Sequence, residues 1–282
     1  MRRYFSANPI RTFLLLVLVL SWPFLIYGFG WFGSREAILT RYLLACTGML
    51  MVALSAFITR AFVERKGFHD VGWNLSHISW YLAALLLFVF LWLGPPLAAL
   101  SFGKLSWNQS IKWDERMVII LSLGGFSLLA GFGEEFGWRG YLLPRWLAEP
   151  RYARAVLVAI GLIWGVWHCA IAIGPLLRLA LAGTISWPST ITAFLGSCLQ
   201  MIDASIALSF IFGALWLKTD SIFLCAFLHG YWIGFRDIVY LFVSFPPIYR
   251  SVTLFTVFAA WLISYQWLKR YERGQVLRPF YM

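Results

Sequence analysis

Apolar runs close to twenty residues long recur along the whole chain, and they constrain its fold more than any other feature. A run of this length crosses the hydrocarbon core of a bilayer as one α-helix. Hydrophobic residues make up 61% of the sequence and charged residues 12%, against about 45–50% and about 25% in soluble domains. Because only helices and closed barrels satisfy every backbone group in lipid, the sequence predicts an all-α fold and excludes most soluble enzymes.

We expect a polytopic transmembrane helix bundle of about eight spans that encloses an intramembrane polar cavity. The expected spans are Ile10–Phe32, Leu39–Ala61, Trp80–Leu100, Met117–Tyr141, Ala155–Ile173, Thr190–Leu217, Ser221–Phe235 and Ser251–Leu268. The stretch Asp237–Tyr249 is apolar but too short and broken to cross the bilayer. The link Gly174–Ser189 is unusually apolar for a loop, and we interpret it as re-entrant or interfacial.

The net charge of +11, from 23 Lys and Arg against 12 Asp and Glu, indicates the orientation of the chain. In a soluble domain this excess would suggest a polyanionic partner, whereas in a membrane protein basic residues concentrate in the cytoplasmic loops. Eight spans put both termini on one side, and most basic residues lie there. We expect a multi-pass protein of the plasma (cell inner) membrane with both termini cytoplasmic, the lipid bilayer as partner, and no nucleic acid.

Ionisable residues at bilayer depth are costly and call for a reason. The fourth expected span contains Glu134 and Glu135, which project about 100° apart on a helix and therefore face different neighbours. Glu135 and Arg139 are spaced i,i+4 in the favourable orientation for an ion pair. Glu134 has no such cation on its helix face, so it is the better candidate for a general base.

Two of the four histidines also lie in the middle of expected spans. His168 follows Trp164 by one helical turn in the fifth span, and His229 lies in the seventh. At 1.5 Å per residue, Glu134, His168 and His229 all lie roughly 12–18 Å from the same side of the membrane. A single intramembrane histidine more often satisfies a neighbouring carbonyl, but three helices that place costly residues at one level indicate a shared site.

Asp203 is the remaining acidic residue inside an expected span. It could cap a polar cavity, pair with an arginine, or mark a span shorter than Thr190–Leu217. We favour a structural role for it.

Three sequence segments contain the intramembrane glutamates and histidines. They are GEEFGWRGYLLPRW (Gly133–Trp146), GLIWGVWH (Gly161–His168) and ALWLKTDSIFLCAFLHG (Ala214–Gly230). In content and order the segments resemble the CAAX prenyl protease and bacteriocin-processing (CPBP, Abi-type) family of intramembrane glutamate endopeptidases. The first segment is specific, and the other two support it by their order.

The resemblance implies hydrolysis of a peptide bond in a membrane-associated or lipidated substrate. Glu134 and His168 would activate the attacking water, and His229 would donate to the oxyanion. Glu135 and Arg139, with Trp164 beside them, would support and charge-balance the site. The resemblance implies no cofactor. It also divides the chain into membrane helices over residues 1–116 with about three spans, a core of this family's type over 117–235, and a C-terminal helix with a basic cytoplasmic tail over 236–282.

Two features depart from the pattern of the family. Its members often carry Asn one turn after a catalytic histidine, as a second polar donor. Here Ala172 stands at that position after His168, and Ile233 stands there after His229. In addition, Trp164 occupies a position where Phe is commoner.

Other functions use the same residues. Glu134, His168 and His229 could ligate Zn²⁺, which accepts two histidines and a carboxylate with an open position for water, although no helix carries an HExxH pair. A non-catalytic bacteriocin-immunity or membrane scaffold protein would need none of this chemistry, and the missing Asn residues favour it. A proton-coupled transporter also buries Glu and His, but the sequence lacks paired broken helices and related halves.

Overall fold

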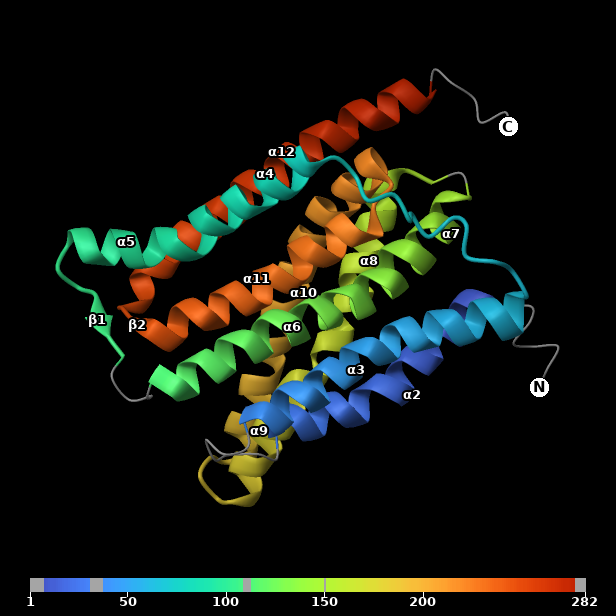
Figure 1. Ribbon diagram of the computed structural model, residues 1–282. Coiled ribbons are helices and arrows are strands. Elements are labelled where there is room, and N and C mark those ends of the chain that lie inside the picture. Colours follow the sequence, from blue (N-terminus) through green and yellow to red (C-terminus); the bar gives the residue numbers. More distant parts are fainter. Residues whose placement is uncertain (1–7, 31–37, 109–112, 150, 277–282) are drawn as a thin grey trace.

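The computed structural model describes residues 8–30, 38–108, 113–149 and 151–276, and these are almost entirely helical (Figure 1). The longer helices are α2 (Pro9–Gly30), α3 (Ile38–Ile58), α6 (Trp113–Gly137), α8 (Ala153–His168), α9 (Ala170–Leu181), α10 (Trp187–Thr219), α11 (Ile222–Phe242) and α12 (Ser251–Val276). The shorter ones are α4 (Ile78–Phe88), α5 (Gly94–Ser101) and α7 (Leu143–Leu147). Two-residue strands β1 (Ser106–Trp107) and β2 (Val243–Ser244) pair antiparallel at one end.

Helix α6 packs along α3 on one side and α11 on the other (Figure 1), and a stripe of its side chains, including Leu121 and Leu129, stays exposed. Helix α8 packs against α10, and α2 packs against both α3 and α9. Helices α4 and α12 cover α11 and α10 respectively. The core therefore centres on the helices that carry the acidic residues and the two mid-span histidines.

Within the described ranges, seven continuous helical stretches are long and apolar enough, by length and composition, to cross a membrane: Pro9–Phe29, Thr40–Glu64, Ile78–Ser101, Ala153–Leu181, Trp187–Thr219, Ile222–Phe242 and Pro247–Gly274. Helices α4 and α5 belong to one stretch, as do α8 and α9. Helix α6, which carries Glu134 and Glu135, is a further long helix that is not among the seven. The predicted all-α polytopic bundle is confirmed, and the protein is a multi-pass membrane protein.

Two predicted helix ends, at Ile173 and Phe235, are wrong, because helix continues past both. Helix α9 runs to Leu181, so most of the predicted Gly174–Ser189 link is helical and Pro175 lies inside the helix. Helix α11 continues to Phe242, well past the predicted end at Phe235. In an apolar environment the backbone must satisfy its own hydrogen bonds, so helix extends wherever the side chains permit it.

Close helix contacts depend on glycine at particular positions. A Cβ atom on Gly131 of α6 would lie 2.6 Å from the Ala226 carbonyl oxygen and 2.7 Å from the Gly230 nitrogen of α11. A Cβ atom on Gly165 of α8 would lie 2.4 Å from the Ile202 Cα of α10. Small residues that let backbones touch are a main source of helix association in membranes.

We expect Gly131→Ala to lower the stability of the folded protein by about 1–3 kcal/mol, because the added methyl group forces α6 and α11 apart. The matched control is Gly125→Ala on the same helix, where a Cβ atom meets nothing within 4 Å and the better helix propensity of Ala is worth up to about 1 kcal/mol. Thermal unfolding of both variants in detergent tests this. Equal midpoints would contradict the close approach of the two helices.

Candidate active site

Four segments bring all six predicted site residues into one buried cluster. Glu134 and Glu135 come from α6, and Arg139 comes from the π-helical turn Trp138–Leu142 that follows it. The other members are Trp164 and His168 on α8 and His229 on α11. The two glutamates and the arginine are fully buried, whereas 17% of the His168 side chain is exposed. The cluster is therefore closed except on the side of His168.

Oε1 of Glu135 accepts hydrogen bonds from both Arg139 and His229. Arg139 Nη1 donates to Glu135 Oε1 at 2.8 Å, which is the predicted i,i+4 pair. His229 Nδ1 lies 2.8 Å from the same oxygen. Since an ionised carboxylate only accepts, Nδ1 is the donor. Glu135 thereby fixes the orientation of the His229 ring and leaves Nε2 directed elsewhere.

Glu134 faces both histidines through its two oxygens. Oε1 lies 3.9 Å from His229 Nε2, and Oε2 lies 4.0 Å from His168 Nε2. These separations exceed hydrogen-bond length and match the span that one bridging water molecule covers. The carboxylate and the two ring nitrogens therefore border the same small space.

The position of Glu134 is fixed by the indole of Trp164. Trp164 Nε1 donates to Glu134 Oε2 at 2.6 Å. The carbonyl of Trp164 also lies 3.0 Å from His168 Nδ1. Because a carbonyl only accepts, the hydrogen of a neutral His168 is on Nδ1, and Nε2 faces Glu134 as a lone pair. Trp164 thus orients both groups that the sequence assigns to water activation.

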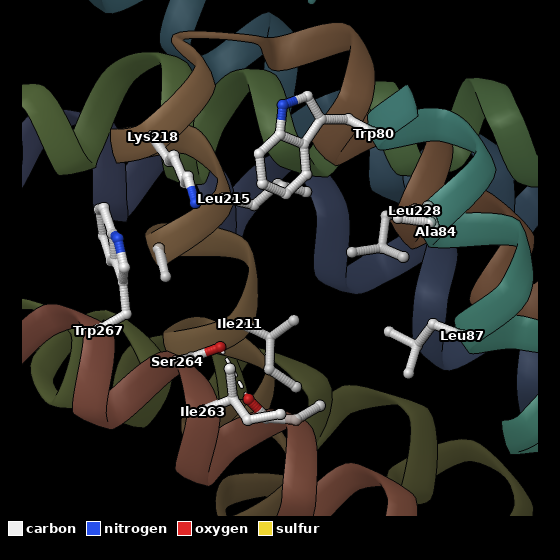
Figure 2. A pocket seen from close by; sticks show the side chains of 13 residues that line it. Trp80, Ala84, Leu87, Ile211, Leu215, Lys218, Leu228, Ile263, Ser264 and Trp267 are labelled. Atoms are coloured by element: carbon white, nitrogen blue, oxygen red, sulfur yellow. Dashed lines mark hydrogen bonds between the residues drawn. The ribbon is translucent and has the colours of Figure 1, made fainter. Parts of the chain in front are cut away.

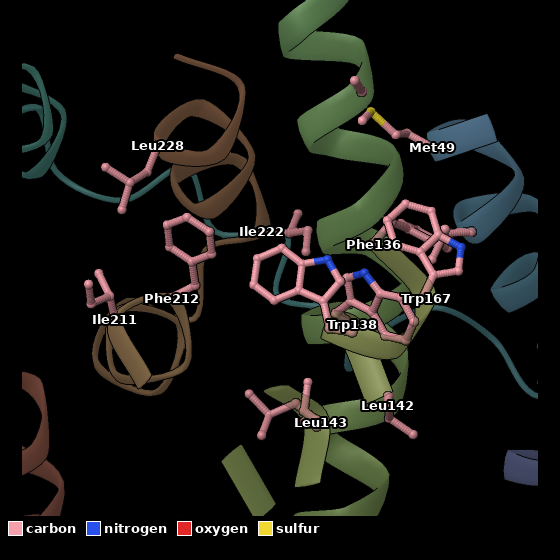
Figure 3. Packing of buried hydrophobic residues seen from close by; sticks show 14 of the residues in the cluster. Met49, Phe136, Trp138, Leu142, Leu143, Trp167, Ile211, Phe212, Ile222 and Leu228 are labelled. Carbon is pink, nitrogen blue, oxygen red and sulfur yellow. The ribbon is translucent and has the colours of Figure 1, made fainter. Parts of the chain in front are cut away.

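Aromatic rings enclose the charged groups. The Arg139 guanidinium lies 4.6 Å from the ring centroid of Trp164 and 5.1 Å from that of Phe212 on α10. Phe212 also packs on the His229 ring at 5.3 Å. The sequence analysis missed Phe212, because a phenylalanine in an apolar helix carries no signal of its own. Figure 3 shows it among the buried side chains, together with Trp138 and Trp167.

Several buried polar atoms of the cluster have no hydrogen-bond partner among the described residues. They are Glu134 Oε1, Glu135 Oε2, and Nε and Nη2 of Arg139. Buried polar groups are almost always satisfied, by protein or by a bound molecule. Both carboxylates and the guanidinium thus retain capacity to bind water or a polar substrate group.

The residues that mark departures from the family pattern lie as follows. Ala172 is buried in the first turn of α9. The side chain of Ile233 lies outside the described part of the chain. Asp203 lies exposed on α10. It takes part in none of the ion pairs among the described residues, so the predicted pairing with an arginine is not observed. Helix α10 runs from Trp187 to Thr219, so the helix is not shorter than the predicted span Thr190–Leu217.

Among the described residues, no group of three or more His, Cys, Asp or Glu is arranged to hold a metal ion. Ligands of one Zn²⁺ lie about 2.0–2.2 Å from it, which brings them closer together than the 3.9–4.0 Å between Glu134 and the two histidines.

Comparison with known proteins bears on the part of the chain that holds the cluster. Residues 116–235 match the family described as type II CAAX prenyl endopeptidase Rce1-like. This match confirms the resemblance drawn from the three sequence segments. No curated protein and no solved structure matches the chain.

We expect Trp164→Phe to destabilise the fold by about 1.5–3 kcal/mol, because the buried Glu134 carboxylate loses a hydrogen bond while an aromatic ring still covers Arg139. Trp138→Phe is the matched control: Trp138 is equally buried, and its Nε1 has no hydrogen-bond partner among the described residues. Thermal unfolding of the two variants measures the difference. Equal losses would show that the indole–carboxylate contact contributes nothing.

Proposed function

We propose, from the match of residues 116–235 to the type II CAAX prenyl endopeptidase Rce1-like family, that the protein is an intramembrane endopeptidase. Its substrate would be a membrane-associated or lipidated peptide or protein, a class that includes prenylated CAAX-type peptides. The observation that carries the proposal is the convergence of Glu134 with His168 and His229, from three separate helices, on one buried space. We further propose a location in the plasma membrane with both termini in the cytoplasm.

In the proposed mechanism, Glu134 and His168 activate water. The His168 Nε2 lone pair and the Glu134 carboxylate face each other across 4.0 Å, so a water molecule between them donates one hydrogen to each. Glu134 then removes a proton while the water oxygen forms a bond with the scissile carbonyl carbon. When the C–N bond breaks, that proton passes to the leaving nitrogen. The products are a free amine and a carboxylic acid.

His229 would stabilise the oxyanion of the tetrahedral intermediate. Because its Nδ1 donates to Glu135, Nε2 carries a hydrogen only when the ring is protonated. Glu134 and Glu135 together carry two negative charges and Arg139 carries one positive charge, so a protonated His229 makes the group neutral. Burial of a neutral, mutually paired set costs far less than burial of a net charge.

A non-catalytic immunity or scaffold role is the second candidate, and Ala172 and Ile233 favour it, because family members often carry Asn at these positions. Ile233 follows His229, the proposed oxyanion donor, and loss of one such donor costs roughly 10²–10³ in rate. The presence of Glu134, His168 and His229 together in one buried cluster favours catalysis instead, because burial of ionisable residues is costly.

We expect Glu134→Gln to lower the rate of peptide cleavage roughly 10²–10⁴-fold, the range for loss of a general base. His229→Ala is expected to cost roughly 10²–10³-fold. Purified protein in liposomes with a library of lipidated and membrane peptides provides the measurement. His69→Ala and Glu149→Gln are the controls, because both side chains are exposed outside the cluster. Unchanged turnover by Glu134→Gln would reject the proposal.

We also expect cleavage to continue in a protein that has been purified without a metal affinity tag and dialysed against a chelator. In the proposed mechanism Glu134 and His168 activate water without a metal ion. Metal content by mass spectrometry and activity would be measured on the same sample. One tightly bound zinc per chain, with activity lost on its removal, would favour the metalloprotease alternative.

A further inference from the structure

A groove of about 330 Å³ lies between α4, α10, α11 and α12 (Figure 2), and none of the acidic cluster residues lines it. Its walls are almost wholly apolar and include several alanines, so the helices leave room for a narrow occupant. Ile263 on its rim is 71% exposed. In a membrane protein this side of the bundle faces lipid.

One end of the groove carries a cation between two indole rings. Lys218 Nζ lies 4.8 Å from the ring centroid of Trp80 and 6.0 Å from that of Trp267. All three residues line the groove. Lys218 lies at the C-terminal end of α10, Trp80 near the N-terminal end of α4, and Trp267 in the C-terminal half of α12. Trp and Lys side chains are typical of the membrane–water interface.

The groove runs from this polar end toward the bilayer centre. On α10 it extends from Lys218 to Ile211, and on α4 from Trp80 to Leu87. On α12 it extends from Trp267 to Ala260, so on each of these three helices the groove covers a rise of seven positions, or roughly 10 Å of depth. A cationic entrance above a narrow apolar channel is complementary to an anionic headgroup with a hydrocarbon chain.

Within the described part of the chain, no acidic group is paired with the charge at the entrance. None of the ion pairs among the described residues involves Lys218. A lysine near the surface of an anionic leaflet attracts lipid headgroups, which raises binding about fivefold per residue. The groove thus favours a ligand that carries both a negatively charged headgroup and a hydrocarbon chain.

The groove backs onto the candidate active site without entering it. Leu228 lines the groove, whereas its neighbour His229 reaches Glu135. Likewise Ile211 lines the groove, and its neighbour Phe212 packs on the His229 ring. Helices α10 and α11 therefore form a wall of the groove on one face and contribute residues to the candidate active site on the other. A molecule bound in the groove does not contact Glu134 or His168, which do not line it.

We propose that this groove is a binding site for one anionic phospholipid, with an acyl chain between α4, α10 and α12 and the headgroup phosphate on Lys218. The site is independent of the proposed proteolysis, since it rests on the groove and its charge alone. It would hold α4 and α12 against the two helices that carry His229 and Phe212.

Native mass spectrometry of the delipidated full-length protein tests this proposal. Dioleoyl phosphatidylglycerol and dioleoyl phosphatidylcholine would be titrated separately, and the dissociation constant of the first lipid bound would be compared. We expect phosphatidylglycerol to bind at least fivefold more tightly. Lys218→Gln should abolish that preference, and Ala83→Trp, which fills the groove from its exposed wall, should remove the tight site for both lipids.

Matched controls are Lys66→Gln, an exposed lysine outside the groove, and Ala193→Trp, an exposed alanine elsewhere on α10. Both should bind phosphatidylglycerol as the unmodified protein does. Equal affinity for the two lipids, or an unchanged preference in Lys218→Gln, would overturn the proposal. Displacement of phosphatidylglycerol by an isoprenylated cysteine peptide would also overturn it and assign the groove to substrate.

Discussion

The pairing of Glu135 Oε1 with both Arg139 and His229 is the interaction on which the rest of the site depends. A buried carboxylate without partners would cost several kcal/mol, and here two donors at 2.8 Å offset that cost. The pairing also sets the hydrogen on His229 Nδ1, so the opposite nitrogen faces Glu134. With Glu135 Oε1 committed in this way, Glu134 is the carboxylate that faces both histidines across gaps of 3.9–4.0 Å.

This geometry requires helices that approach more closely than ordinary side chains allow. Gly131 and Gly230 bring α6 and α11 into backbone contact, next to Glu134 and His229. Gly165 does the same for α8 and α10, one turn from His168. Since lipid offers no hydrophobic force between helices, these contacts and the polar cluster supply much of what holds the core in register.

The sequence predicted the convergence of Glu134, His168 and His229 from depth alone, because rise per residue is fixed in a helix. It could not predict that Trp164 binds Glu134, since helix spacing pointed the indole only toward His168. Nor could it identify Phe212, whose role depends on how α10 packs against α11. The helix ends at Leu181 and Phe242 were missed because a backbone in apolar surroundings must satisfy its own hydrogen bonds, so helix continues through Pro175 and beyond Phe235.

Adjacent residues on α10 and α11 link the two faces of the protein. Leu228 and His229 project about 100° apart on their helix, so one borders the apolar groove and the other borders the acidic cluster. Ile211 and Phe212 repeat this division on α10. Any rotation of α11 that changed the groove would also move His229 relative to Glu135. Because the cluster tolerates little displacement from its 2.8 Å contacts, packing on the lipid-facing side constrains the geometry of the buried site.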